Sequence, residues 1–401
     1  MFADISSSRL SKGTHGEHPY LLSLTLPCSE DKIHALRNAL LVHGAHGSNA
    51  DETRSIRELV WPQLLDIETT NTAAEFARFV SIADPSSHVE SQVERDLRPT
   101  LKQSPEVQAI CTKKELQDLL YAYDSWCKEQ CTITSKYKQV RGVSQGYIQG
   151  MGRVAAVLCL TLPLHLVWAC LCKLFSDVMP GWYTLSNHLG TALGNQLLDE
   201  VLIAVDPQLR KHIVSCFIPD YATLTAASRI YCIFGQTTPT SATLPLYDAI
   251  LCIGPHFVVP LIVAEIVISR DRILAEPKPR KVLDITKLAC DADTMVSTAV
   301  ALLQQLPKSL RQRLEAWPLQ TSTSRQAGTP EATATAAAAA GTSSTTSPHG
   351  MQPVQHISPS GLSGGQGAAT FTGGVHQPPP PSTSSGHPPT QAEQRSRRSS
   401  T

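Results

Sequence analysis

Two long apolar runs, residues 154–175 and 250–268, restrict what this chain can fold into, because each must be covered by lipid or by protein. A helix that spans a bilayer needs about 20 consecutive apolar residues with few polar interruptions. The first run is interrupted by Pro163 and His165, and the second contains two prolines, a histidine and Glu265. These interruptions favour helices that are buried inside a large helical domain, and no integral membrane segment is predicted.

Elsewhere in the first 317 residues, apolar side chains recur with the spacing of α-helices. Between Ile33 and Leu41 they fall on one face, and Gly44 follows as a stop signal. A break is expected near Gly190 and Gly194. The same reasoning predicts further helices at residues 52–65, 73–82, 113–128, 151–162, 164–178, 185–205, 207–214, 221–234, 246–253, 258–274, 281–290 and 293–317. Short alternating strands joined by tight turns are not found, so the predicted fold class is all-α, with a dozen or more helices.

Two polar segments are predicted to be loops. Residues 89–105 are polar, and Pro99 biases Arg98 away from helical backbone, so we expect this arginine in an extended segment. Residues 131–143 are basic and lead into the second half of the domain.

The composition changes after Trp317. Residues 318–401 consist mainly of Ala, Ser, Thr, Gly, Pro and Gln, which cannot bury enough apolar surface to offset chain entropy. We therefore expect a disordered low-complexity tail. Residues 1–28 carry no periodic signal and are predicted to be a flexible N-terminal arm, which leaves one helical domain at residues 29–317.

Charge and cysteine content exclude several classes of protein. The chain has 34 basic residues (lysine plus arginine) and 34 acidic residues (aspartate plus glutamate). It therefore lacks the excess of positive charge that attracts nucleic acids. The 11 cysteines are scattered, and many lie inside apolar runs, as expected for reduced thiols in a cytoplasmic protein. Residues 1–20 do not resemble a signal peptide.

The sequence contains no self-sufficient catalytic motif. Phosphate-binding loops, dinucleotide-binding glycine patterns, zinc-protease histidine pairs and nucleophile elbows are all missing. His43 and His46 flank a loop but have no cysteine or acidic partner, so neither a metal nor another cofactor is predicted. The chain therefore either binds a partner or completes the active site of another protein.

Gln149 stands out because it lies among glycines, within residues 146–152, at the start of an apolar run. Glycines allow a backbone to approach another molecule closely, and an amide can both donate and accept hydrogen bonds. The amide could cap a helix or bond to a neighbouring helix, and buried polar groups usually find such partners. Alternatively, it could be presented to the chemistry of another protein. The residues alone leave both interpretations open.

Tyr147-Ile148-Gln149-Gly150-Met151 resembles the Tyr-x-Gln-Gly-Met motif of the TBC domain family, which comprises GTPase-activating proteins for Rab and related small GTPases. Other elements resemble the Ile-x-x-Asp-x-x-Arg, Arg…Trp…Leu-Leu and Leu-Trp-Asp motifs of the family. In this sequence they are Val93-x-x-Asp96, Arg57-x-x-x-Trp61-x-x-Leu64-Leu65 and Leu246-Tyr247-Asp248.

One branch of the family is particularly similar. The segments Leu197-Leu198-Asp199, Val205-Asp206-Pro207 and Leu303-x-x-Leu306-Pro307 resemble the fungal-type checkpoint proteins of mitotic exit and septation. That branch acts on a Ras-like GTPase at the spindle pole, together with a second, scaffold-like protein. The resemblance covers residues 30–317 and implies a cytoplasmic protein that acts at the spindle pole or centrosome.

The resemblance implies a small Ras- or Rab-like GTPase in its GTP form as partner. Gln149 would orient the attacking water. An arginine inserted in trans would raise the rate of GTP hydrolysis by about 10³–10⁵-fold. The residues implied to support these two side chains are Asp96, Tyr147 and Gly150. The family places the arginine three residues after the aspartate, but Pro99 occupies that position here.

The nearest arginine is Arg98, one position early, and Arg95 is a weaker substitute. Arg98 is therefore the predicted catalytic arginine. The alternative is a weakened pseudo-GAP that acts as a GTPase-binding or scaffold adaptor.

Overall fold

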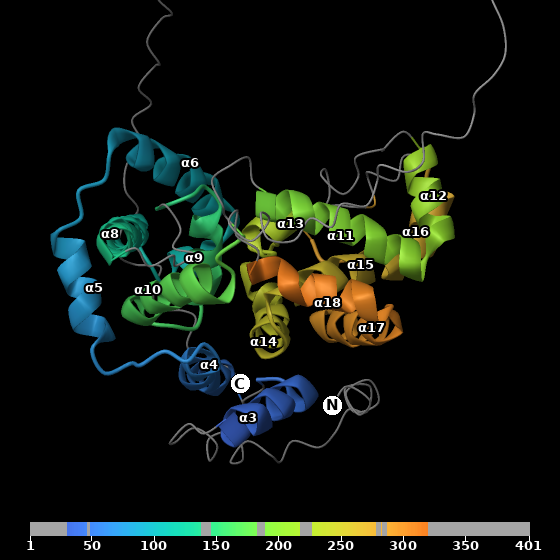
Figure 1. Cartoon of the computed structure of the whole chain (residues 1–401), viewed down its shortest axis with the longest axis horizontal. Coiled ribbons are helices and arrows are strands. Elements are labelled where there is room, and N and C mark those ends of the chain that lie inside the picture. Colours follow the sequence, from blue (N-terminus) through green and yellow to red (C-terminus); the bar gives the residue numbers. More distant parts are fainter. Residues whose placement is uncertain are drawn as a thin grey trace, which may run out of the picture. The chain divides into compact units, whose positions relative to one another are not determined.

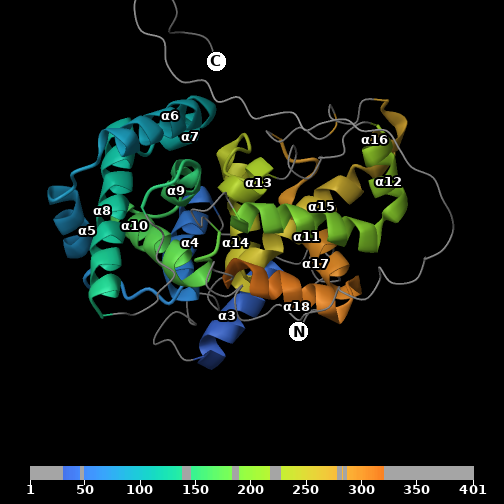
Figure 2. The same cartoon turned by 45° about the horizontal axis from the view of Figure 1, so that its top comes forward.

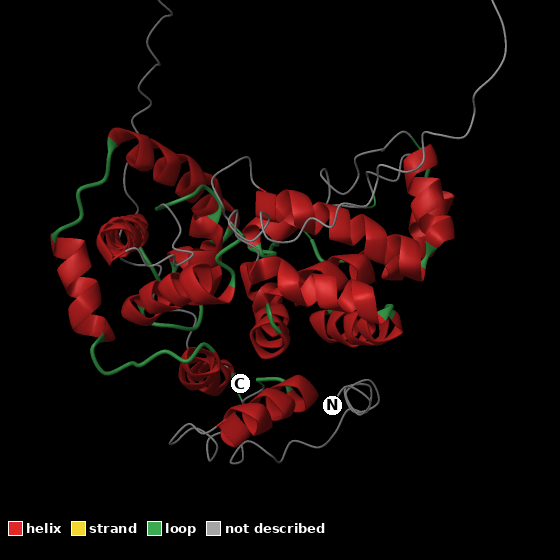
Figure 3. Cartoon of the chain, viewed as in Figure 1, coloured by secondary structure: helices red, strands yellow, loops and turns green. Residues whose placement is uncertain are grey.

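The computed structural model describes residues 30–45, 49–137, 146–182, 189–216, 227–277, 282 and 287–319. These residues all belong to one compact unit, Met1–Glu331. They form helices joined by loops, without a strand in the described ranges, which confirms the all-α prediction (Figure 3). The predicted N-terminal arm lies outside the described residues, as does the predicted tail beyond Leu319.

The first half of the domain is built around helices α5, α8 and α10, which pack against one another, while α6 packs on α8 and α9 (Figure 1). The bounds of its helices are α3 (Glu30–His43), α4 (Ala50–Leu64), α5 (Thr72–Ser81), α6 (Ser87–Gln103), α7 (Pro105–Gln108), α8 (Lys113–Tyr137), α9 (Met151–Cys159) and α10 (Leu164–Lys173), followed by a π-helical turn (Leu174–Val178).

The second half is organised around α15, which packs against α11 and α17, and α14 connects to the first half by packing on α3 (Figure 2). The bounds of its helices are α11 (Leu189–Val205), α12 (Pro207–Ser215), α13 (Ala227–Cys232), α14 (Leu244–Ile253), α15 (Val258–Ile268), α16 (Arg270–Ala275), α17 (Ala292–Gln305) and α18 (Lys308–Ala316).

The two apolar runs form buried helices, as predicted, and no described helix is both long and apolar enough to cross a bilayer. Helix α15 is buried along nearly its whole length. Its one acidic residue, Glu265, accepts a hydrogen bond of 2.7 Å from Arg229 Nη2 and another from the backbone N–H of Ala289. The charge that interrupts the apolar run is thus compensated inside the core.

The prediction of extended backbone at Arg98 is wrong, because residues 87–103 form the continuous helix α6 with Pro99 inside it. A proline within a helix removes one backbone hydrogen bond and costs about 3 kcal/mol or more. Val93, Leu97 and Leu101 are buried on the same helix, and each such burial contributes about 1.5–3 kcal/mol. Packing of the buried face therefore outweighs the local preference.

Two other loop or break predictions are also wrong. Helix α8 continues through Tyr137 into the segment predicted to be a basic loop. Helix α11 begins at Leu189, after residues outside the described ranges, and it runs unbroken through Gly194. A Cβ atom at Gly194 would lie 2.5 Å from the Trp317 ring, so this glycine serves close packing rather than a turn.

Near the end of the domain, the predicted helix at residues 293–317 is two helices, α17 and α18, separated at Leu306 and Pro307. Half of the predicted helix at 281–290 falls outside the described residues, and the described positions, 282 and 287–290, are not helical.

Two of the sequence motifs meet at one buried aspartate. The Nη2 atom of Arg57 lies 2.8 Å from Asp248 Oδ2, and the indole Nε1 of Trp61 donates to Asp248 Oδ1 at 2.8 Å. All three side chains are buried, and the Tyr247 ring stacks on Trp61. These motifs therefore connect α4 to α14 and have a structural role.

Candidate functional site

Gln149 lies in a short segment, residues 146–150, that leads into helix α9. The segment begins and ends at glycines with left-handed backbone, Gly146 at φ 116° and Gly150 at φ 106°. Each also approaches a neighbour too closely for a side chain, since a Cβ would lie 2.4 Å from Asp124 Oδ1 at Gly146 and 2.6 Å from the Tyr231 ring at Gly150. The glycines thus fix the path of the backbone on both sides of Gln149.

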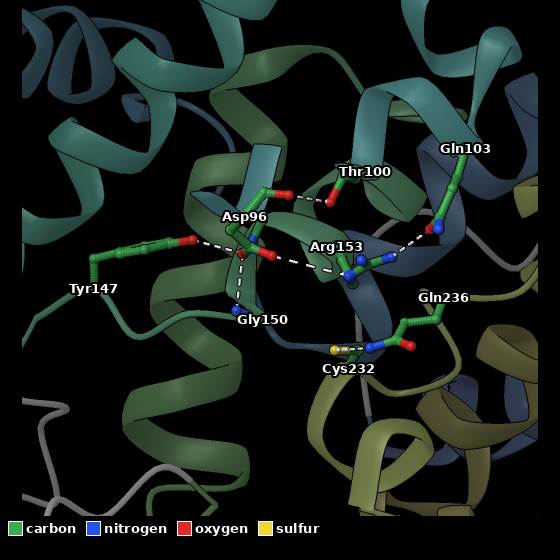
Figure 4. Close-up of polar contacts among 9 residues, drawn as sticks. Asp96, Thr100, Gln103, Tyr147, Gly150, Arg153, Cys232 and Gln236 are labelled. Atoms are coloured by element: carbon green, nitrogen blue, oxygen red, sulfur yellow. Dashed lines mark hydrogen bonds and ion pairs between the residues drawn. The ribbon is translucent and has the colours of Figure 1, made fainter. Parts of the chain in front are cut away.

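Asp96 on α6 holds this segment through one carboxylate oxygen. Its Oδ2 atom accepts hydrogen bonds from the Tyr147 hydroxyl at 2.6 Å and the Gly150 backbone N–H at 2.8 Å (Figure 4). The same oxygen accepts a third from the Gly152 backbone N–H at 3.0 Å. Asp96 is only 3% exposed. Burial raises the pKa of Tyr147 well above its usual value, and the adjacent Asp96 raises it further, so the phenol stays protonated and donates. The three predicted supporting residues, Asp96, Tyr147 and Gly150, are therefore in direct contact.

A second buried aspartate, Asp124 on α8, holds the other end of the segment. Its Oδ1 atom accepts a hydrogen bond of 2.9 Å from the Tyr147 backbone N–H, and its Oδ2 atom pairs with Lys128 at 2.9 Å. Asp124 was not among the site residues predicted from the sequence. Its only signal was a carboxylate among the inward positions of a predicted amphipathic helix, beside Tyr123.

The Gln149 side chain is exposed, and its amide has no hydrogen-bond partner among the residues that the structure describes. The residue that precedes helix α9 as its cap is Gly150, and no side chain caps this helix end. A clamped backbone with an outward, uncommitted amide is an arrangement that can bind a water molecule or a polar group of a partner.

Arg98 lies on a different flank of α6 from Asp96. A helix advances about 100° per residue, so the two side chains are about 200° apart around the helix axis. Arg98 is exposed and lines a shallow surface pocket with Lys102 and Lys113, at the end of α6 and the start of α8. Pro99, three residues after Asp96, occupies the motif's arginine position.

Arg153, on the first turn of α9, follows the clamped segment by three residues, and it was not among the residues predicted from the sequence. Its Nη1 atom donates to Gln103 Oε1 at 2.9 Å, and its Nε atom lies 3.9 Å from Asp96 Oδ1 (Figure 4). The signal for it was its position two residues after the Tyr-x-Gln-Gly-Met motif. Within the described residues, no group of histidine, cysteine or acidic side chains could hold a metal ion.

The fold and the clamped glutamine segment define a member of the Rab-GTPase-TBC domain family. The model of that family matches residues 54–274, more than half of the chain, and the chain belongs to it. Two solved structures have a similar fold. The flagellar RabGAP TBC domain of Chlamydomonas aligns with TM-score 0.50 at 19% identity, covering 75% of this chain and 90% of that one. The Ypt/Rab-GAP domain of Gyp1p aligns with TM-score 0.53 at 13% identity, covering 72% and 97%.

The chain is also similar to individual proteins that are named as mitotic checkpoint or cell division control proteins. It is 22% identical to the putative mitotic check point protein BUB2 of Dictyostelium discoideum, over 70% of this chain and 73% of that protein. It is 22% identical to mitotic check point protein BUB2 of Saccharomyces cerevisiae, over 69% and 88%. It is 26% identical to cell division control protein 16 of Schizosaccharomyces pombe, over 64% and 78%. The family and branch predicted from the sequence are confirmed.

Replacing Tyr147 with phenylalanine is expected to destabilise the domain by about 1.5–3 kcal/mol, because a buried hydrogen bond to a carboxylate is lost. The change removes one oxygen atom and leaves the ring in place. Urea unfolding followed by circular dichroism measures the loss. The matched control is Tyr121→Phe on α8, whose hydroxyl has no hydrogen bond to a described residue and whose loss should cost less. Equal stability of both variants would show that the contact with Asp96 does not hold the segment.

Proposed function

We propose that this chain is a GTPase-activating protein that acts in trans on a Ras- or Rab-like small GTPase in its GTP-bound form. The observation that carries the proposal is the exposed amide of Gln149 on a segment that Asp96 and Asp124 fix from two sides. Membership of the Rab-GTPase-TBC family supports it.

In the proposed mechanism, Gln149 enters the nucleotide pocket of the GTPase. Its amide oxygen accepts a hydrogen bond from the attacking water, and its amide N–H group donates toward the γ-phosphate, so that the water faces phosphorus in line with the leaving group. The buried clamp is relevant here because a misplacement of about 1 Å in such a site can cost about 10²-fold in rate. In the same step an arginine stabilises the charge that develops on the phosphate oxygens, and Arg98, which is one residue before the motif's arginine position, is the residue that the sequence predicts for this role.

We further propose that the activity serves control of mitotic exit and septation, in the cytoplasm and at the spindle pole or centrosome. The names of the checkpoint relatives support this assignment. A scaffold-like second protein is part of the same proposal, because the branch that the sequence resembles works with one.

A single-turnover assay tests the proposed activity. Purified Ras- and Rab-type GTPases are loaded with GTP and mixed with an excess of this chain, and release of inorganic phosphate is followed. We expect at least one GTPase to hydrolyse GTP about 10³-fold faster or more, the range of a completed active site. Absence of acceleration across the panel would reject the activity.

The second candidate function is that of an adaptor which binds a small GTPase with little or no acceleration. One observation favours it, namely that Pro99 stands where the motif has its arginine, while Arg98 lies on the other flank of α6. This function would be identified if the chain binds a GTP-loaded GTPase of the same panel but does not accelerate its hydrolysis of GTP.

A further inference from the structure

The arginine that a GTPase activator inserts must act on the same phosphates as its glutamine, so the two side chains must leave the protein on the same side. Asp96 lies directly beside the Gln149 segment, because its Oδ2 atom accepts hydrogen bonds from the backbone N–H groups of Gly150 and Gly152. On α6, Gln103 shares the flank of Asp96, whereas Arg98 faces the start of α8 together with Lys102. A cation for the site is therefore to be sought near Asp96 and Gln103.

Arg153 is at this place. Its backbone N–H donates to the Gly150 carbonyl at 3.1 Å, so the residue belongs to the same turn as the glutamine segment. Its guanidinium group lies between Asp96 and Gln103, and Figure 4 shows it directed toward both. The side chain is 12% exposed.

The contacts of Arg153 are weak compared with those of the structural arginines. Arg57 and Arg229 donate directly to buried carboxylates. Arg153 instead donates to the neutral amide oxygen of an exposed glutamine, and it is 3.9 Å from Asp96, beyond hydrogen-bond distance. A phosphate oxygen is a stronger acceptor for a guanidinium group than an amide oxygen is. Exchanging Gln103 for a phosphate is thus favourable for Arg153.

We propose that Arg153 is the guanidinium group that this chain places beside Gln149 on the phosphates of bound GTP, with Asp96 and Gln103 as positioning residues. The proposal rests on the proposed function. Water attacks the γ-phosphorus, the bond from that phosphorus to the β–γ bridging oxygen breaks, and GDP, inorganic phosphate and a proton are released. Arg153 is not consumed, and its hydrogen bonds stabilise the negative charge that grows on the bridging and γ-oxygens.

The test compares Arg153→Ala, Arg153→Lys and Arg98→Ala in the single-turnover assay, with the GTPase that the wild-type chain accelerates most. We expect Arg153→Ala to lower the maximal rate about 10³-fold or more, with an unchanged half-saturating concentration of the chain. Arg153→Lys should remain strongly impaired, because an ammonium group lacks the planar fork of the guanidinium. A purely structural or charge-balancing role would instead be rescued by lysine. Thermal unfolding of each variant checks the fold.

Arg272→Ala, which removes an exposed arginine on α16, is the matched control and should keep the full rate. If Arg98→Ala loses the stimulated rate while Arg153→Ala keeps it, the proposal is overturned and Arg98 is the catalytic arginine. If the wild-type chain accelerates no GTPase, the proposed function fails and this inference fails with it. If only the Arg153 variants lose the stimulated rate, the result supports both the proposed function and the role of Arg153.

Discussion

Replacing Gln149 with alanine is expected to lower the stimulated rate of GTP hydrolysis by about 10²–10³-fold, the usual cost of removing one preorganised polar group from a reacting centre. The side chain is exposed and its amide makes no hydrogen bond with a described residue, so its loss should change neither the folding of the domain nor the energy of its core. The expected effect is therefore confined to the chemical step. Single-turnover phosphate release at saturating concentrations of the chain measures it.

Gln305→Ala on α17 is the matched control, since it also removes an exposed glutamine amide but from another helix. Its rate should equal that of the wild-type chain, and both variants should unfold at the wild-type temperature. An intact rate for Gln149→Ala would show that the amide takes no part in hydrolysis. The chain would then be better described as an adaptor.

Replacing Asp248 with alanine is expected to destabilise the domain by about 3–5 kcal/mol, the cost of breaking a buried ion pair by removing one partner. Arg57 would keep its charge in the core without a counter-charge, and the indole N–H of Trp61 would lose its acceptor. Because typical domains are stable by about 5–15 kcal/mol, the variant should still fold at low temperature. The midpoint of urea unfolding measures the difference.

The matched control is Glu129→Ala, which breaks the pair between Arg78 and Glu129. That pair has a similar N–O distance of 2.9 Å, but about half of the Arg78 side chain and a third of the Glu129 side chain are exposed. We expect a loss below about 1 kcal/mol, because solvent screens such pairs. Similar losses in the two variants would mean that burial does not set the importance of the Asp248 contacts.

The helices that could be predicted from sequence were those whose buried face has a clear period, such as α3 and α5. Prediction failed where a local rule competed with packing. Pro99 suggested extended backbone, but the buried face of α6 kept the helix continuous. Gly194 suggested a break, but its close approach to the Trp317 ring requires a small residue there. Tertiary packing of this kind is not visible within a short window of sequence.

The candidate site was predictable in part, because motifs identify residues but not their contacts. The motif that contains Arg57 and Trp61 does not reveal their common acceptor, Asp248, which is 187 residues beyond Trp61 in the chain. Similarly, Asp124 and Arg153 belong to no motif used in the sequence analysis. Their relation to Gln149 depends on how α6, α8 and α9 meet.

The sharing of one Asp96 oxygen among Tyr147, Gly150 and Gly152 has a consequence for how this surface can change over evolution. Three donors at fixed sequence spacing converge on a single atom, so adding or deleting one residue between Tyr147 and Gly152 would shift every donor out of register. Apart from Gln149, side chains that face outward from this segment can be exchanged without loss of these hydrogen bonds, whereas the length of the segment cannot change. Divergent relatives that keep these three hydrogen bonds should therefore differ in the identity of the outward-facing residues and keep the number of residues in this segment.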